Sequence, residues 1–122
     1  MSFKFTHFNF NVMSIENSKK FYKEALGLEE KRRINGEDFI IVYLKDEKSD
    51  FELELTELKS HPQKYNLGEV EFHLAFTTPD YEASLEKHKK MNCVEFINED
   101  MGIYFIVDPD GYWIEILPEK HK

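Results

Sequence analysis

Apolar and polar residues alternate along several stretches of this chain, and two further stretches have the spacing of amphipathic helices. In the first half the pattern predicts a strand at residues 4–12, a helix at 15–26, and strands at 28–34, 38–44 and 50–57. Ser14 is suited to cap the start of the helix, and Gly27 fits the left-handed position after its end. The dipeptide Asn35-Gly36 predicts a tight turn between two of the strands.

The second half repeats this order of segments. The pattern predicts a strand at residues 70–77, a helix from Pro79 to about Met91, and strands at 93–97, 103–107 and 112–117. Thr78 is the expected N-cap of the helix, with Pro79 at its first position. A turn is predicted at Asp108-Pro109-Asp110-Gly111, because proline favours its second position and glycine its last.

The two halves therefore predict an α+β fold built from two βαβββ repeats that form a cupped mixed sheet. Repeat one covers about residues 3–57, repeat two covers about residues 70–117, and residues 58–69 form the crossover between them. Each half alone has too little core to be stable, so we expect one domain over residues 1–122.

Four residues occupy corresponding places in the two repeats. His7 and His73 lie in the first strand of each repeat, and the last strands carry Glu54 and Glu115. Two imidazoles and two carboxylates suit one divalent transition metal ion with room for water or substrate. Glu52 shares a strand face with Glu54 and is the alternative ligand. If these are edge strands instead, the glutamates lie in water, since burying an ionised carboxylate unpaired is costly.

Composition limits the classes of function. The net charge of −8 argues against binding to nucleic acid or to an anionic membrane surface. No apolar run approaches membrane-spanning length, and the start of the chain lacks the apolar region of a signal peptide, so we expect a cytoplasmic protein. The one cysteine, Cys93, excludes an internal disulfide and is expected to be a half-buried structural residue. His61, His88 and His121 are expected to be exposed.

The chain resembles the vicinal oxygen chelate superfamily (glyoxalase, bleomycin resistance protein and dioxygenase), and within it the glyoxalase I (lactoylglutathione lyase) family. The resemblance covers nearly the whole sequence. It rests on the segments Phe5-Thr6-His7, Asn17 to Leu28, Glu54-Leu55-Thr56, Phe72-His73-Leu74-Ala75 and Asp108 to Ile116. The segment Glu54-Leu55-Thr56 points most narrowly to glyoxalase I.

This resemblance implies a mechanism. A divalent metal, with nickel or cobalt favoured and zinc possible, would be held by His7, Glu54, His73 and Glu115. The substrate would be the hemithioacetal of methylglyoxal and a thiol, converted to an S-lactoyl thioester through a cis-enediolate. Glu115 is the expected catalytic base, and Glu54 is the second candidate. We expect a homodimer, and superfamily members build the cup either within one chain or between two.

Two positions depart from the glyoxalase I pattern. The family commonly has an Arg and an Asn that hold glutathione where this chain has Asn11 and Leu58. Loss of the Arg removes a bidentate carboxylate clamp, so the thiol need not be glutathione. The alternatives are another metal-dependent member, such as a fosfomycin-type thiol transferase or an acyl-CoA epimerase, and a metal-free antibiotic-binding protein.

Overall fold

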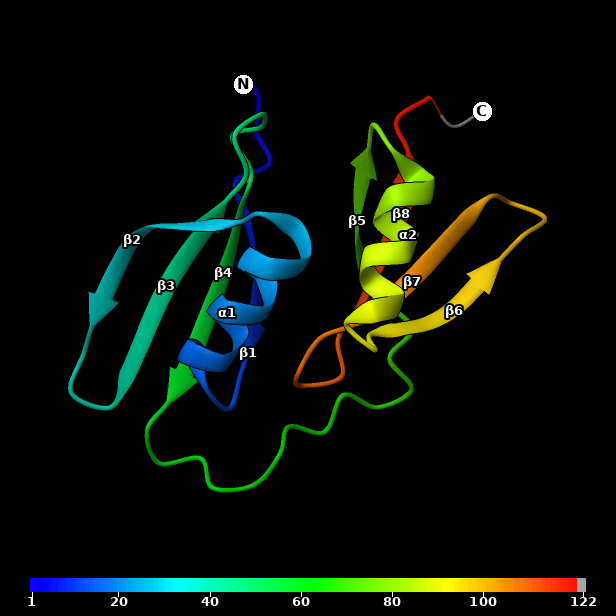
Figure 1. The fold of residues 1–122 in the computed structure, drawn as a ribbon. Coiled ribbons are helices and arrows are strands. Elements are labelled where there is room, and N and C mark those ends of the chain that lie inside the picture. Colours follow the sequence, from blue (N-terminus) through cyan, green and yellow to red (C-terminus); the bar gives the residue numbers. More distant parts are fainter. Residues whose placement is uncertain (121–122) are drawn as a thin grey trace. The chain divides into compact units, whose positions relative to one another are not determined.

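The computed structural model describes residues 1–120 and contains two compact units with the same β-α-β-β-β order, which confirms the predicted α+β class. Figure 1 shows the elements of both units. The first unit, Met1–Tyr65, contains β1 (His7–Asn11), α1 (Ile15–Leu26), β2 (Glu29–Asn35), β3 (Phe39–Lys45) and β4 (Glu52–Leu58). The second unit, Asn66–Lys122, contains β5 (His73–Thr78), α2 (Tyr81–Lys90), β6 (Val94–Asn98), β7 (Ile103–Val107) and β8 (Trp113–Pro118). The boundary between the units falls inside the predicted crossover.

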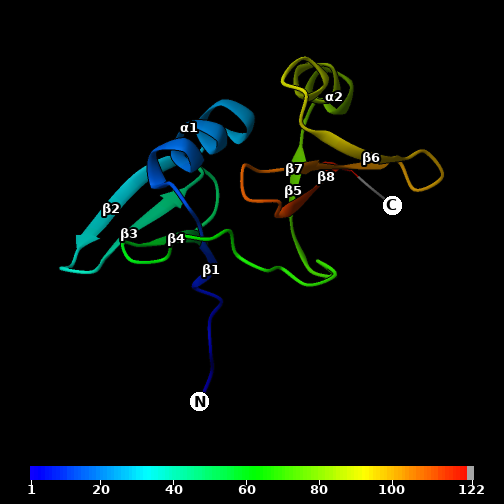
Figure 2. The same cartoon turned by 90° about the horizontal axis from the view of Figure 1, so that it is seen from below.

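Each unit is a four-stranded mixed sheet with its helix on one face (Figure 2). The strand orders are β1-β4-β3-β2 and β5-β8-β7-β6. In both sheets the first strand pairs in parallel with the last, and the other neighbours are antiparallel. The last strand of each unit therefore lies inside its sheet, between the first and third strands.

The core of the first unit lies between α1 and its sheet. Phe10, Val42 and Leu55 come from three adjacent strands and are at most 1% exposed, as are Ile15 and Tyr22 of α1. Burial of large apolar side chains at this density stabilises the pairing of helix and sheet. Alternation along the strands consequently directs the intervening residues to the sheet face away from α1.

The helix α1 begins and ends where the sequence predicts. The Ser14 side chain accepts a hydrogen bond from the backbone N–H of Asn17, and Gly27 adopts a φ of 71°. The strand before it is shorter than predicted, because β1 begins at His7 rather than Lys4. Its parallel partner β4 begins only at Glu52, which lies opposite His7, so the preceding residues have little strand to pair with.

The helix α2 corrects one predicted cap. Asp80, not Thr78, is the N-cap, and its side chain accepts a hydrogen bond from the N–H of Ala83 at 3.1 Å. Thr78 instead ends β5, and Pro79 precedes the cap rather than starting the helix. Strand pairing with Pro118 of β8 holds Thr78 in the sheet, which delays the helix. Within residues 1–120, neither helix has the length and apolar character required to cross a membrane.

The predicted turn at Asp108 is confirmed. The N–H of Gly111 donates to the carbonyl of Asp108 at 3.0 Å, and Gly111 adopts a φ of 95°. The Asp108 carboxylate also accepts hydrogen bonds from the backbone N–H groups of Asp110 and Tyr112, each at 2.9 Å. This turn fixes the start of β8, the strand that carries Glu115.

Candidate metal centre

In the first unit, His7 and Glu54 lie together on the sheet face away from α1. The parallel pairing of β1 and β4 sets His7 opposite Glu52 and Asn9 opposite Glu54, so His7 and Glu54 are diagonal neighbours. The Nε2 atom of His7 lies 3.6 Å from Oε1 of Glu54. The structure thus brings together the two predicted site residues of the first repeat.

The second unit repeats this arrangement in the same register. His73 lies opposite Trp113 and Ala75 lies opposite Glu115 in the parallel pair of β5 and β8. The Nε2 atom of His73 lies 3.1 Å from Oε1 of Glu115. His73 therefore corresponds to His7, and Glu115 corresponds to Glu54, residue for residue.

The two pairs also match in accessibility. The side chains of His7 and His73 are 39% and 42% exposed, while those of Glu54 and Glu115 are each 14% exposed. An accessible imidazole nitrogen beside a largely shielded carboxylate oxygen offers N and O donors that suit divalent transition metals. Within residues 1–120, no three His, Cys, Asp or Glu side chains form a ready-made metal cluster. The structure therefore establishes the pairs, and the four-ligand set stays a prediction.

Tyr43 belongs to the site of the first unit and was not identified from the sequence. Its hydroxyl donates a 2.5 Å hydrogen bond to Oε2 of Glu54, and its ring makes an edge contact with the ring of His7. The hydrogen bond to Glu54, together with burial, raises the pKa of the Tyr43 hydroxyl. Tyr43 lies within the apolar run of β3, so the sequence pattern alone predicts a core residue there. Only the antiparallel register of β3 and β4, which sets Tyr43 opposite Glu54, identifies it as part of the site.

The alternative ligand, Glu52, is engaged elsewhere. Its Oε1 accepts a hydrogen bond from Nη2 of Arg32 at 2.9 Å. The Arg32 guanidinium also stacks over the Tyr43 ring, with Cζ 3.6 Å from the ring centroid. Because Glu52 already has a cationic partner, Glu54 is the better placed of the two carboxylates to serve as a ligand.

The two positions that depart from the glyoxalase I pattern lie near the ends of their strands. The side-chain amide of Asn9 donates to Oδ1 of Asn11 at 2.7 Å, and the hydroxyl of Thr56 donates to Oδ1 of Asn9 at 2.6 Å. Leu58, the last residue of β4, is 39% exposed. The hydrogen-bonded amides of Asn9 and Asn11 and the exposed Leu58 therefore occupy the region in which the glyoxalase I family commonly has the Arg and Asn that hold glutathione.

The expectation that His88 is exposed is wrong. His88 is 2% exposed, and its Nδ1 lies 2.7 Å from the hydroxyl of Tyr104, which also bonds to Ser84. Burial raises the pKa of Tyr104 to about 12. The neighbouring lysines suggested a solvated helix face, but His88 and Leu85 are three residues apart and share the buried face of α2.

The burial of the other two histidines and of the cysteine can also be compared with expectation. His61 is also less exposed than expected, because its ring stacks on Tyr65 with centroids 3.9 Å apart. His121 lies outside the described residues. Cys93 is more deeply buried than expected, at 6% exposure. Its thiol donates to the carbonyl of His88, which agrees with the structural role expected for it.

Comparison with known proteins gives a consistent set of relatives. A sequence model of the Glyoxalase/Bleomycin resistance protein/Dioxygenase superfamily matches residues 4–116. A lactoylglutathione lyase of Pseudomonas aeruginosa is 29% identical over 93% of this chain and 81% of its own length. The uncharacterized protein YwbC of Bacillus subtilis is 30% identical over 94% of this chain and 97% of its own. The structure of a trypanothione-dependent glyoxalase I from Leishmania major superposes with a TM-score of 0.86 at 31% identity, covering 98% of this chain and 88% of that one.

Proposed function

We propose that this chain, which belongs to the Glyoxalase/Bleomycin resistance protein/Dioxygenase superfamily, is a metal-dependent lyase of the glyoxalase I type. Its reaction would isomerise the hemithioacetal of methylglyoxal and a thiol to the S-lactoyl thioester. The ligands of one divalent metal ion would be His7, Glu54, His73 and Glu115, with nickel or cobalt favoured and zinc possible. When bound, the metal would polarise the two substrate oxygens as a Lewis acid.

One observation carries this proposal. The two His–Glu pairs occupy the same register in their sheets, with Nε2–Oε1 distances of 3.6 Å and 3.1 Å. Ordinary surface ion pairs have no reason to recur at matching positions of two repeats. The likeness to a lactoylglutathione lyase and to a glyoxalase I structure supports the same reading.

Glu115 is the proposed base. The reaction removes a proton from the carbon that bears the hydroxyl and sulfur, and returns a proton to the adjacent carbonyl carbon. The hydroxyl proton moves in the same direction, from the oxygen on the first carbon to the oxygen on the adjacent carbon, so atoms balance. A carboxylate beside the reacting carbons carries out such a transfer. Glu54 is the second candidate for this role, and the histidines would remain ligands throughout.

The thiol is proposed to be glutathione or another, and two positions of this chain bear on the choice. Asn11 and Leu58 occupy the positions at which glyoxalase I commonly holds glutathione, and Asn11 is bonded to Asn9 rather than presenting a cation. The related Leishmania major enzyme is described as trypanothione-dependent, so thiol choice varies among relatives of this chain. A panel of cellular thiols is therefore part of the test below.

We further propose that the protein works in the cytoplasm as a homodimer. A chain with a single cysteine, which cannot form an internal disulfide, suits a reducing compartment. Several large apolar side chains on strands remain exposed, among them Ile34 at 44% and Phe96 at 48%, which suits burial against a second copy. Light scattering after size-exclusion chromatography measures the assembly directly, and a monomeric mass contradicts it.

The decisive experiment strips the protein with chelator and restores nickel, cobalt or zinc one at a time. Thioester formation from methylglyoxal and each thiol is then followed by ultraviolet absorbance. Activity that returns with metal supports the proposal and names both metal and thiol. Metal binding without thioester formation with any thiol would favour another metal-dependent superfamily member, and fosfomycin with the same thiols is the next substrate. A protein that binds no metal would favour a metal-free binding role.

A further inference from the structure

The two sheets place different residues around otherwise matching His–Glu pairs. Antiparallel pairing sets Tyr43 opposite Glu54 in the first unit and Phe105 opposite Glu115 in the second. The rings occupy the same place against the histidines. Tyr43 makes an edge contact with His7 at 5.8 Å between centroids, and Phe105 makes one with His73 at 5.1 Å. Tyr43 and Phe105 are therefore equivalent positions that differ by one hydroxyl.

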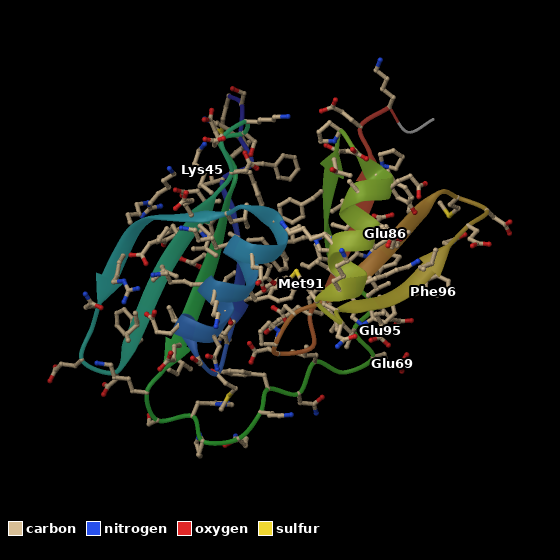
Figure 3. All side chains as sticks on the ribbon, viewed as in Figure 1. Lys45, Glu69, Glu86, Met91, Glu95 and Phe96 are labelled. Atoms are coloured by element: carbon tan, nitrogen blue, oxygen red, sulfur yellow. The ribbon has the colours of Figure 1, made fainter. Side chains whose placement is uncertain are left out.

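The residues that pair with Tyr43 and Phe105 on the neighbouring strands β2 and β6 also differ, being charged in the first unit and aromatic in the second. The second strand of each unit, β2 or β6, has a register shift, after which Arg32 pairs with Tyr43 and Phe96 pairs with Phe105. Arg32 stacks over the Tyr43 ring. Phe96 lies on the edge strand β6 (Figure 3), and its ring stacks on that of Phe105 at 6.4 Å between centroids.

The residues opposite the histidines complete this contrast. Glu52, which pairs with Arg32, corresponds to Trp113, whose ring lies 5.3 Å from that of Phe105. A charged row thus adjoins Glu54, and an aromatic row adjoins Glu115.

This difference affects how freely each carboxylate can turn. The Tyr43 hydroxyl holds Oε2 of Glu54, which leaves Oε1 directed at His7. A hydrogen bond to an ionised acceptor is among the strongest in proteins and adds geometric constraint. Arg32, stacked on the ring and bonded to Glu52, limits the motion of Tyr43 itself. The phenyl ring of Phe105 offers Glu115 no such donor.

We propose that Tyr43 is a positioning residue that fixes Glu54 as a stationary ligand. Phe105, at the equivalent position of the second unit, lacks this hydroxyl, so the Glu115 carboxylate, which is hydrogen-bonded to His73 through Oε1, can turn about that contact and move the proton. This assignment rests on the function proposed above. It explains from the fold why two equivalent glutamates would take different roles. Both parts concern the hydroxyl alone, so single-atom substitutions can test them.

The test compares Tyr43→Phe with Phe105→Tyr. Metal affinity is measured by calorimetric titration of stripped protein with cobalt or nickel, separately from kcat and KM at saturating metal. We expect Tyr43→Phe to weaken metal binding about tenfold, since loss of a residue that orients a ligand has this order of effect. Added metal should return its kcat toward the wild-type value. Phe105→Tyr should retain metal affinity and lower kcat about tenfold, because the new hydroxyl would restrain the base.

Phe8→Tyr is the matched control. Phe8 is 40% exposed and lies on the opposite face of β1 from His7, so a hydroxyl added there should change neither quantity. Wild-type metal affinity in Tyr43→Phe, or wild-type kcat in Phe105→Tyr, would overturn the proposal. If Tyr43→Phe fails to fold, Phe105→Tyr decides alone. A wild-type protein that binds metal without lyase activity overturns only the proposed reaction, and the affinity of Tyr43→Phe still decides the positioning role. A wild-type protein that binds no metal overturns both.

Discussion

The hydroxyl of Tyr104 lies 2.7 Å from Nδ1 of His88, and this hydrogen bond joins β7 to α2 inside the second unit. Both side chains are at most 2% exposed. A polar pair at this depth is tolerated because each group satisfies the other. The bond therefore specifies how α2 is seated on its sheet.

Tyr104→Phe should consequently destabilise the fold. The substitution keeps the ring but deprives buried His88 of its hydroxyl partner, and a lost partner of this kind costs about 1–3 kcal/mol of unfolding free energy. Urea unfolding followed by circular dichroism measures the loss. Tyr81→Phe is the control, since it removes a hydroxyl from the ring packed on Tyr104 without touching the His88 bond. Equal stabilities for the two variants would contradict the prediction.

The N-cap of α2 gives a second stability prediction. Because Asp80 caps the helix, Asp80→Ala should lower the free energy of unfolding by about 1 kcal/mol. Thr78→Ala should cost less, since the Thr78 hydroxyl accepts only a long 3.4 Å hydrogen bond from Asp80 N–H. Thermal unfolding of both variants ranks them. A larger loss of stability in Thr78→Ala than in Asp80→Ala would indicate that Thr78 is the N-cap and would contradict this prediction.

Acid should weaken the first unit through Glu30. Hydrogen bonds from Arg33 and Lys19 lower the pKa of Glu30 from 4.5 to about 2. Since the folded state binds this proton less readily than the unfolded state, the stabilisation is complete above about pH 4.5 and is lost as pH falls toward 2. Glu30→Gln should flatten the dependence of stability on pH in that window. Glu29→Gln, at a more exposed pair with Lys23, should leave the slope unchanged, and a wild-type slope in Glu30→Gln would sink the prediction.

Replacing each site glutamate by the neutral Gln should affect different quantities, kcat for Glu115 and metal affinity for Glu54. Glu115→Gln should lower kcat by about 10²–10⁴, and added metal should not rescue it, because an amide cannot accept the proton. Glu54→Gln should lose metal affinity first and regain activity with excess metal. Kinetics across a metal titration separate the two. Full activity of Glu54→Gln without added metal would indicate a three-ligand enzyme of another type.

Local sequence patterns determined much of this fold. Ser14 and Gly27 mark the ends of α1 because capping and left-handed φ values are local properties. The turn at Asp108 was predictable for the same reason. The repeat of elements and the α+β class followed from the order of these segments. The same repeat singled out His7, Glu54, His73 and Glu115 as candidates.

Pairing between distant segments decided the rest. His88 carries the polarity of a surface residue and is buried because Tyr104, sixteen positions away, satisfies it. Asp80 rather than Thr78 caps α2 because pairing with β8 retains Thr78 in the sheet. Tyr43 reached Glu54 through the register of β3 and β4, which no local pattern encodes. The sequence by itself determined which residues could carry the chemistry, since repeats and alternation are written along the chain. Tertiary structure decided which of them touch, since sheet register depends on contacts between residues far apart in sequence.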